Sequence, residues 1–241
     1  MREKTNGIVL SVIAYNDKSS FVHIYTEKFG RVTYSLPNVK GKRGRLSRSL
    51  FAPFSILELD VEHLPTREIQ KIAEARVLSP HTSIPFDPVK NAVVLFLAEA
   101  LSRTVREQEQ NLPLYHFIVD SVNLYDLLEE GKANFHLVFL LKISEFLGFR
   151  IHRESYSPGY RFDMAEGSFT PRAADHPYYL EPTQATLLHA VLLLEYGDLA
   201  SFGLNREQRG FILDVLVAYF RLHLPDLKEI KSLEILKSLF G

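Results

Sequence analysis

Hydrophobic and polar residues alternate along the first third of the chain in the manner of short β-strands. Residues 7–15, 21–26 and 31–36 are rich in β-branched and aromatic side chains, and polar turns separate them. Runs of this composition between turn residues predict a meander of three strands. Residues 54–62 then alternate strictly, with Leu57, Leu59 and Val61 on one face and acidic residues on the other. This pattern predicts a half-buried fourth strand.

Residues 67–78 fit two interpretations. The spacing of Ile69, Ile72, Ala73 and Arg76 suits a helix, whereas a small barrel needs a fifth strand here. We interpret the segment as a strand over 68–78. Five strands with a long loop between the third and the fourth predict an OB-like five-stranded barrel in residues 1–79.

Four aromatic residues of these strands are candidates for stacking on nucleobases. They are Tyr15, Phe21, Tyr25 and Tyr34. Aromatic residues are enriched in strands whatever the protein binds, so core and cross-strand packing is the favoured interpretation for each.

The pattern changes after a proline-rich segment at residues 79–88, where we place a domain boundary at 79/80. Apolar residues at helical spacing beyond it predict helices at 88–106, 113–130, 134–148, 182–195, 205–223 and 229–239. Residues 135–147 and 187–194 are apolar nearly all round, which predicts the buried centre of a bundle. The fold class is therefore mainly α with an N-terminal all-β domain.

Residues 150–181 lose helical periodicity and gain prolines and glycines, which predicts an irregular insertion with short β pieces at 160–163 and 168–170. His152, Asp163, Asp175 and His176 lie in it, but their spacing matches no tight pair of metal ligands. We therefore predict no metal and no other cofactor.

Composition restricts the classes of site. Hydrophobic residues make up 46% of the 241 residues, enough for a substantial core, and there is no cysteine. Disulfides, a thiolate nucleophile and cysteine-ligated zinc are thereby excluded. No stretch approaches the ~20 apolar residues of a membrane span, and the short apolar run at 8–15 resembles a strand more than a signal peptide. We expect a cytoplasmic protein without membrane contact.

Charge is unevenly distributed although the net charge is only −1. Residues 1–79 hold 13 Lys and Arg against 8 Asp and Glu, and residues 80–241 hold 15 against 21. One stretch, residues 37–48, combines two glycines and no acid with five cations: Lys40, Lys42, Arg43, Arg45 and Arg48. Such a loop suits phosphate oxygens, so we predict DNA binding by these five residues, helped by Lys18 and Arg31.

Catalytic motifs are absent from the sequence: it has no nucleophile elbow, no phosphate-binding P-loop, no dinucleotide fingerprint and no zinc-protease motif. The strongest catalytic alternative is a nuclease in which Glu58, Asp60 and Glu62 hold Mg²⁺ near the basic loop. The same alternation is typical of any solvent-facing strand, so we favour a non-enzymatic protein.

Several segments together resemble the RecO family of bacterial recombination mediators. They are Gly7-Ile8-Val9-Leu10, the basic stretch Val39–Arg48, Pro53–Leu59 and the closing Ile230–Leu236. Each motif alone is weakly specific, but they follow one another in order along the whole chain. The resemblance implies an N-terminal OB fold, a helical C-terminal domain, binding of single- and double-stranded DNA, strand annealing, and cooperation with RecR and single-stranded DNA-binding protein in loading RecA.

The chain departs from this family in one respect. Many members carry a four-cysteine zinc site in the helical domain, and the insertion at 150–181 occupies its place without any cysteine. A zinc role is therefore not carried over, and we expect aromatic packing to hold the insertion instead. An RNA-binding or ribosome-associated OB-fold protein remains open as an alternative function, and a nuclease as a more distant one.

Overall fold

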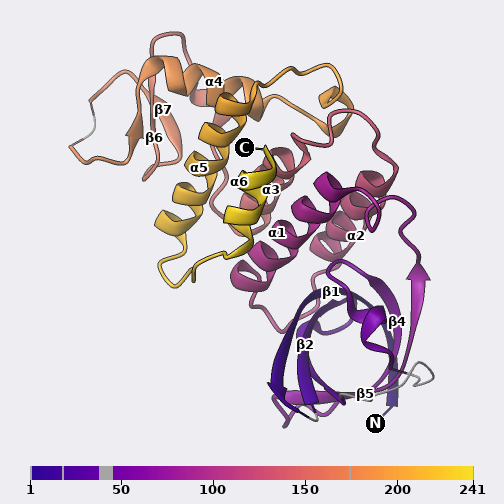
Figure 1. Ribbon diagram of the computed structural model, residues 1–241. Coiled ribbons are helices and arrows are strands. Elements are labelled where there is room, and N and C mark those ends of the chain that lie inside the picture. Colours follow the sequence, from indigo (N-terminus) through magenta and orange to yellow (C-terminus); the bar gives the residue numbers. More distant parts are fainter. Residues whose placement is uncertain (1, 18, 38–45, 174, 241) are drawn as a thin grey trace. The chain divides into compact units, whose positions relative to one another are not determined.

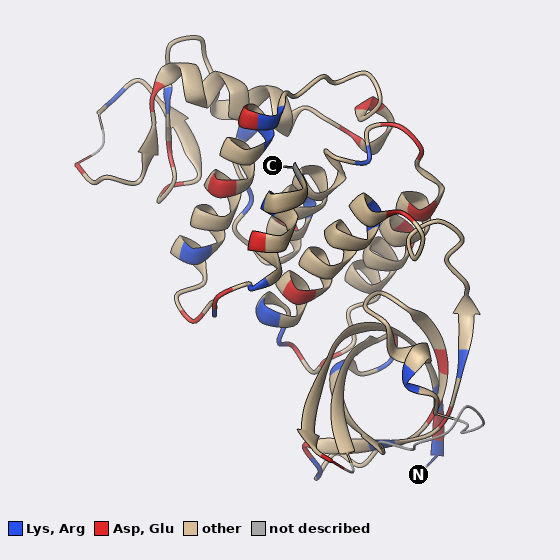
Figure 2. Cartoon of the chain, in the orientation of Figure 1, with Lys and Arg blue, Asp and Glu red and all other residues tan. Residues whose placement is uncertain are grey.

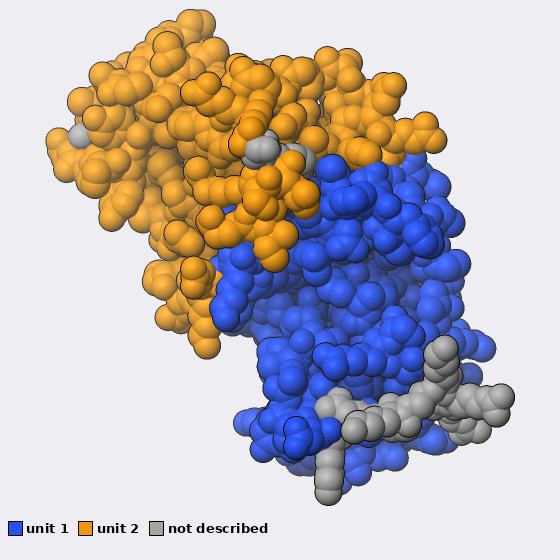
Figure 3. Space-filling model, viewed as in Figure 1, with its two compact units in different colours: residues 1–127, 230–233 blue, residues 128–229, 234–241 orange. Residues whose placement is uncertain are grey.

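The computed structural model describes residues 2–17, 19–37, 46–173 and 175–240 of the chain (Figure 1). The chain divides into two compact units, coloured separately in Figure 3. Unit 1 consists of residues 1–127 and 230–233, and unit 2 of residues 128–229 and 234–241.

Unit 1 contains a closed five-stranded barrel. Its strands are β1 (Arg2–Asn16), β2 (Ser19–Thr26), β3 (Gly30–Pro37), β4 (Ile56–Glu62) and β5 (Ile69–Ser79). They follow the order β1-β2-β3-β5-β4, with β3 and β5 parallel and every other pair antiparallel. The OB-like barrel is thereby confirmed, and residues 67–78 contribute a strand and no helix.

The barrel core follows from the alternation of the strands. Buried side chains come from every second position, because successive residues of a strand point to opposite faces. The core residues are Val9, Val22, Ile24, Val32, Tyr34, Leu36, Phe51, Leu57, Leu59, Val61 and Ile72. Tyr34 is completely buried among them, so it is a core residue and is not available for stacking on a base.

Strand β1 begins at Arg2, five residues before the start expected from the sequence. Its first seven residues pair with β4, from Arg2 opposite Glu62 to Ile8 opposite Ile56. Residues 2–6 are all polar, so no apolar pattern predicted a strand there; Arg2 and Lys4 are exposed, and the buried residue among them, Thr5, is polar too. The ladder to β4 holds this part of β1 in place and closes the barrel.

Two helices, α1 (Pro88–Thr104) and α2 (Leu112–Leu127), belong to the same compact unit as the barrel. Helix α1 begins at the predicted position, with Asp87 accepting hydrogen bonds from the backbone N–H groups of Val89 and Lys90 and with Pro88 at the first helical position. Helix α2 ends at Leu127, three residues earlier than expected. The boundary between compact units falls after α2, and the domain boundary at 79/80 stays a prediction.

The segment between the barrel and α1 is held by a buried carboxylate. Asp126, near the end of α2, accepts hydrogen bonds from the backbone N–H groups of Thr82, Ser83 and Ile84 at 2.7–2.9 Å. Lys90 is also buried and donates to Ser83 Oγ at 2.6 Å and to the backbone oxygen of Asp126 at 2.8 Å. This network satisfies the backbone of a segment that has no regular secondary structure.

Unit 2 is built on α3 (Phe135–Phe146), α4 (Pro182–Leu192), α5 (Arg206–His223) and most of α6 (Ser232–Phe240). Its described residues also form two short 3-10 turns, Arg153–Ser155 and Tyr196–Asp198. Helix α3 is buried nearly all round, as its composition predicts. Helix α4 ends at Leu192 and not at residue 195, and Leu193 is 54% exposed. The apolar run at 187–194 was therefore wrongly expected to be buried throughout, since it extends past the end of the helix.

The irregular insertion also lies in unit 2. It contains β6 (Arg161–Asp163), β7 (Ser168–Thr170) and β8 (Tyr179–Leu180), which form a small antiparallel sheet in the order β7-β6-β8. The two β pieces expected from the sequence are present, and β8 is an addition. Gly167, with φ of +62°, makes the turn before β7 where a Cβ atom would lie 2.5 Å from the Tyr219 hydroxyl.

Candidate nucleic-acid interface

The basic loop is the first predicted part of the interface. Lys40, Lys42, Arg43 and Arg45 lie outside the described residues, as does Lys18. Arg48 is described: it is exposed at the start of a 3-10 turn, η1 (Arg48–Phe51). The assignment of these cations to DNA stays a prediction.

Both ends of the loop are anchored in the barrel. Before it, Leu36 of β3 is 2% exposed, and after it Phe51 of η1 is 2% exposed within the same core. Leu46 and Leu50 pack partly buried against that core. The described residues on either side of the basic loop are therefore fixed in the barrel core.

Arg31 lies on the outer face of β3. Its Nη1 donates to the backbone oxygen of Val105 at 3.3 Å, and its Nη2 lies 2.5 Å from His23 Nδ1. A guanidinium can only donate, so His23 Nδ1 is the acceptor and the imidazole is neutral. Burial, followed by the charges of Arg31 and Arg103, lowers the pKa of His23 to about 4, which agrees with this assignment.

Two further arginines lie near Arg31. Arg103 and Arg106 belong to the end of α1 and to the residues that follow it, and both lower the pKa of Arg31, after the larger effect of burial. Arg103 also forms an ion pair with Glu99 at 3.3 Å. The charges of Arg103 and Arg106 thus both act on Arg31. The sequence contains a weak signal for these residues, an Arg-x-x-Arg pair at the end of a predicted helix. Arg103 and Arg106 were not predicted as site residues from it.

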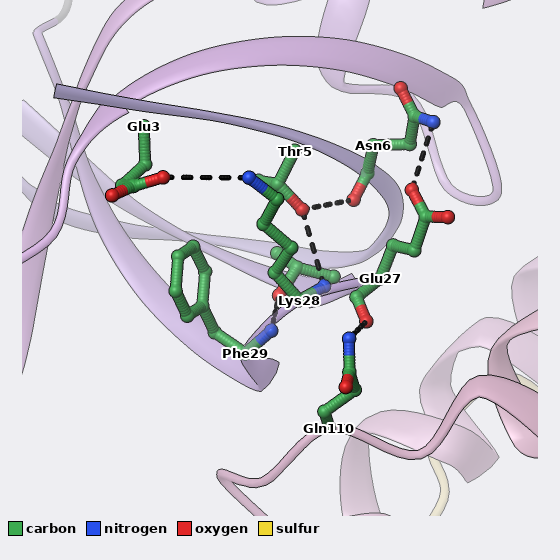
Figure 4. A network of polar contacts seen from close by, with 8 residues as sticks. Glu3, Thr5, Asn6, Glu27, Lys28, Phe29 and Gln110 are labelled. Atoms are coloured by element: carbon green, nitrogen blue, oxygen red, sulfur yellow. Dashed lines mark hydrogen bonds and ion pairs between the residues drawn. The ribbon is translucent and has the colours of Figure 1, made fainter.

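The turn between β2 and β3 is tied to its surroundings by a polar network (Figure 4). Asn6 donates to Glu27 at 3.0 Å, Lys28 pairs with Glu3 at 3.4 Å, and Gln110 donates to the backbone oxygen of Glu27 at 3.3 Å. Next to it, Gly30 has φ of +60°, and a Cβ atom there would lie 2.2 Å from the backbone oxygen of Glu109. The residues after α1 therefore cover this end of the barrel.

The acidic face of β4 is paired with cations of the neighbouring strands. Arg76 of β5 donates to both carboxylate oxygens of Glu58 at 2.5 and 2.6 Å, and Arg2 of β1 lies 3.9 Å from Asp60. Figure 2 marks the charged positions of these strands. Cross-strand ion pairs account for the alternation, and among the described residues no group of three or more His, Asp or Glu is placed to hold a metal ion.

The four candidate stacking residues separate into two pairs. Tyr25 and Tyr34 are completely buried, which agrees with the favoured core interpretation. Tyr15 is 65% exposed, and its ring lies 4.7 Å from that of the partly buried Phe21. Only Tyr15 and Phe21 of the four are therefore on an accessible surface.

The residues weighed above and set aside as metal ligands come together only in part in the insertion at 150–181. His176 Nε2 lies 3.4 Å from Asp163 Oδ2, whereas His152 contacts Glu154 at 3.2 Å. Aromatic contacts dominate the segment: Phe162 lies 5.0 Å from Phe169, and Tyr156 stacks on His189 of α4 with ring centres 3.8 Å apart.

Comparison with known proteins decides the family. Residues 1–81 match the model of the Recombination protein O N-terminal domain, and residues 85–234 match that of the Recombination protein O C-terminal domain. The chain belongs to the RecO family. The resemblance noted from the sequence motifs is confirmed, and the two matched regions together cover nearly the whole chain.

Relatives of this RecO-family chain are similar over their full length. A protein named DNA repair protein RecO from Bacteroides fragilis is 40% identical over 241 residues, covering all of both chains. Proteins of the same name from Azobacteroides pseudotrichonymphae and Flavobacterium psychrophilum are 37% and 30% identical, again over all of each chain. The family places the chain in DNA repair, and no helix among the described residues is long and apolar enough to span a membrane.

Proposed function

We propose that this RecO-family chain is a non-enzymatic DNA-binding mediator that anneals complementary strands and helps to load RecA on single-stranded DNA. The observation that carries the proposal is the full-length match to the RecO family on a chain with a strongly basic stretch at residues 37–48. Its partners in this role are single- and double-stranded DNA, RecR and single-stranded DNA-binding protein. The role places it in the cytoplasm at the nucleoid.

DNA contacts in this proposal come from Lys40, Lys42, Arg43, Arg45 and Arg48, with Lys18 and Arg31 beside them. Arg48 is exposed at the point where the basic segment rejoins the barrel, which supports an outward-facing role. Arg31 has a guanidinium fixed by His23 and Val105, so its contribution is a charge held in one position. Contacts of this kind hold phosphates without reading bases.

In this proposal residues 80–241 bind the protein partners, because the net negative charge of these residues repels DNA phosphate. The opposite charge of residues 1–79 favours phosphate, so the two tasks are separated along the chain. Pull-down of RecR and of single-stranded DNA-binding protein by the full chain and by its five-fold loop variant tests this division. Loss of either partner in the loop variant would contradict it.

Annealing is the decisive assay. The protein is expected to accelerate pairing of complementary strands coated with single-stranded DNA-binding protein, whereas an RNA-binding or ribosome-associated protein would bind nucleic acid without this acceleration. Absence of acceleration, with intact binding to RNA, would favour that alternative.

The loop itself is tested by replacing its five cations with alanine. If each neutralises about one phosphate, the slope of log K against log salt should fall in magnitude by roughly 3.5 for single strands and 4.5 for duplex. Removing exposed cations typically changes the free energy of unfolding by no more than about 0.5 kcal/mol each, so the variant should stay folded. An unchanged slope in a folded variant would show that DNA binds elsewhere.

A further inference from the structure

Unit 1 has an open recess of about 350 Å³ whose wall is mostly apolar. It lies between the residues around η1, the end of β5 with the segment that follows it, and α1. Its apolar wall includes Val77, Pro80, Ile84, Pro85, Val94 and Leu95. The polar residues of the described wall are three serines, Asn91 and His81, and no Asp, Glu, Lys or Arg is among them. Such a recess suits an apolar side chain and offers no ion pair to a charged one.

His81 is the one residue of this described wall that could become charged near neutral pH. Burial lowers the pKa of His81, although the charge of Asp126 acts in the opposite direction with a smaller effect. Because the ordinary pKa of histidine is about 6.5, a lowered pKa leaves the imidazole neutral at pH 7. The wall therefore carries no charge at that pH, and an apolar group can enter the recess without desolvating an ion.

An exposed phenylalanine follows this wall in the chain. Phe86 comes directly after Pro85 and is 83% exposed, more than any other large hydrophobic residue of the described chain. Hydrogen bonds fix its backbone: the N–H groups of Phe86 and Asp87 both donate to the backbone oxygen of Ser83 at 3.0 Å, and the Ser83 N–H donates to Asp126. A ring presented on a fixed turn loses little backbone freedom when a partner buries it, which favours binding.

The ring and the recess belong to one patch of surface, because Pro85 is part of the wall and Phe86 is the next residue. One exposed ring alone is ordinary on a protein surface. A two-fold dimer, however, is isologous: a feature of one copy meets its complement on the other, and the reverse contact forms at the same time. A projecting apolar ring next to an uncharged recess is self-complementary in this sense, and the described wall brings no like charges together when two copies meet.

From this placement we infer that the recess receives Phe86 of a second copy of the chain, so that two chains form a closed two-fold dimer. A phenylalanine buries about 150–250 Å², so two rings that are 83% exposed and the two walls that they cover together remove roughly 500–800 Å² from water. Stable interfaces bury at least about 1,200 Å², so the dimer is expected to be weak and to dissociate on dilution. This self-association goes beyond the proposed DNA-binding function and does not depend on it.

Sedimentation velocity of the full chain without DNA, from about 1 to about 500 µM, tests for the dimer. The mass should rise with concentration from 27.6 kDa toward twice that value and no further. Phe86→Ala should raise Kd at least about 30-fold, the threshold of one interface hot spot. Tyr15→Ala is the matched control: it removes a 65% exposed ring of the same unit that does not line the recess, and Kd should stay within about two-fold.

A pair of charge variants tests whether ring and recess meet each other. Ala52 is an exposed residue of the wall, so Ala52→Glu places a carboxylate in the recess, and Phe86→Lys replaces the ring by a cation. Neither variant should dimerise with itself, because each leaves a charge opposite an apolar group. A mixture should contain more dimer than either variant alone at the same total concentration. The mixed pair keeps one ring in one unaltered recess and places the introduced lysine against the introduced glutamate.

Each outcome bears on the inference. An original chain that stays monomeric over the whole concentration range would overturn it, and so would a dimer that Phe86→Ala leaves intact. Assembly beyond the dimer would overturn the closed two-fold arrangement. A mixture that is no more dimeric than its separate components would overturn the insertion of the ring into the recess. Positions 52 and 86 are both exposed, so thermal melting should show that every variant is folded.

Discussion

Two irregular segments of this RecO-family chain are ordered by opposite means. In residues 79–87 of unit 1, the backbone N–H groups of Thr82, Ser83 and Ile84 donate to one buried carboxylate, that of Asp126. Residues 150–181 of unit 2 instead use three short strands and a group of packed rings centred on Phe162 and Phe169. A segment without helix or long strand must satisfy its backbone and exclude water, and the comparison shows that a charge or apolar area can each do this.

The difference has consequences for what each segment depends on. A buried carboxylate that accepts several hydrogen bonds is sensitive to protonation and to loss of its charge. Packed phenylalanine rings are sensitive to loss of volume and carry no ionisable group. The four predictions that follow test this contrast.

The largest effect is expected from Phe162→Ala. Phe162 is completely buried and its ring lies 5.0 Å from Phe169 and 6.0 Å from Tyr219. Emptying such a site costs about 3–5 kcal/mol, so hydrogen exchange of unit 2 amides should accelerate strongly. Tyr178→Ala, in the same segment but 50% exposed, should cause little change. Equal acceleration by both variants would refute the role of ring packing.

A smaller loss is expected from Asp126→Asn. The amide keeps one acceptor oxygen but loses the charge that strengthens the hydrogen bonds from Thr82, Ser83 and Ile84. Hydrogen bonds to a charged group contribute about 1.5–3 kcal/mol, so the free energy of unfolding should fall by about 2–3 kcal/mol. Amide hydrogen exchange should become faster in residues 82–84 and in α2. Glu129→Gln, at an exposed position, is the control, and a loss as large there would argue against a specific role for Asp126.

Acid should act on the same carboxylate. Burial by itself raises the pKa of Asp126, but the hydrogen bonds from Ile84, Thr82 and Ser83 outweigh it and hold the pKa well below its ordinary value near 4. Because the pKa is lower in the folded state, this stabilisation is present above pH ~4 and is lost as the pH falls below it. The free energy of unfolding in urea should therefore fall more steeply for the original chain than for Asp126→Asn as the pH is lowered from about 5 to about 2.5. Parallel declines would show that the carboxylate does not couple folding to pH.

The smallest effect is expected from chelation. The chain has no cysteine, and the insertion is packed by aromatic rings, so EDTA should leave the melting temperature unchanged. Elemental analysis should find less than stoichiometric zinc in purified protein. Stoichiometric zinc together with chelator-induced unfolding would show that the segment has a metal site formed by other ligands.

Much of the fold could be predicted from local patterns. The alternation of Leu57, Leu59 and Val61 predicted β4, and Asp87 followed by Pro88 predicted the start of α1, because period-two burial and helix capping depend on residues close in sequence. The ends of helices were less well predicted. Helix α4 ends at Leu192 although the apolar run continues to Leu194, so an apolar run alone does not mark the end of a helix.

The candidate site was predicted only in part. The sequence identified the basic stretch at 37–48 and named Arg31, since a cluster of cations is visible in one segment. It did not bring Arg103 and Arg106 to Arg31, because residues about 70 positions apart meet only through packing of α1 against the barrel. It also ranked Tyr15, Phe21, Tyr25 and Tyr34 alike, whereas the structure buries two and exposes Tyr15.

By itself the sequence determined the succession of strands and helices, the absence of any cysteine-based site, and the position of the basic segment, all of which depend on composition and short-range periodicity. Only the tertiary structure decided which polar groups are buried together and which aromatic rings are exposed. The bulge at Tyr15 depends on pairing with another strand, and the three backbone N–H groups that donate to Asp126 come from another segment. Such pairings are set by the free energy of packing the whole unit, which no local pattern contains.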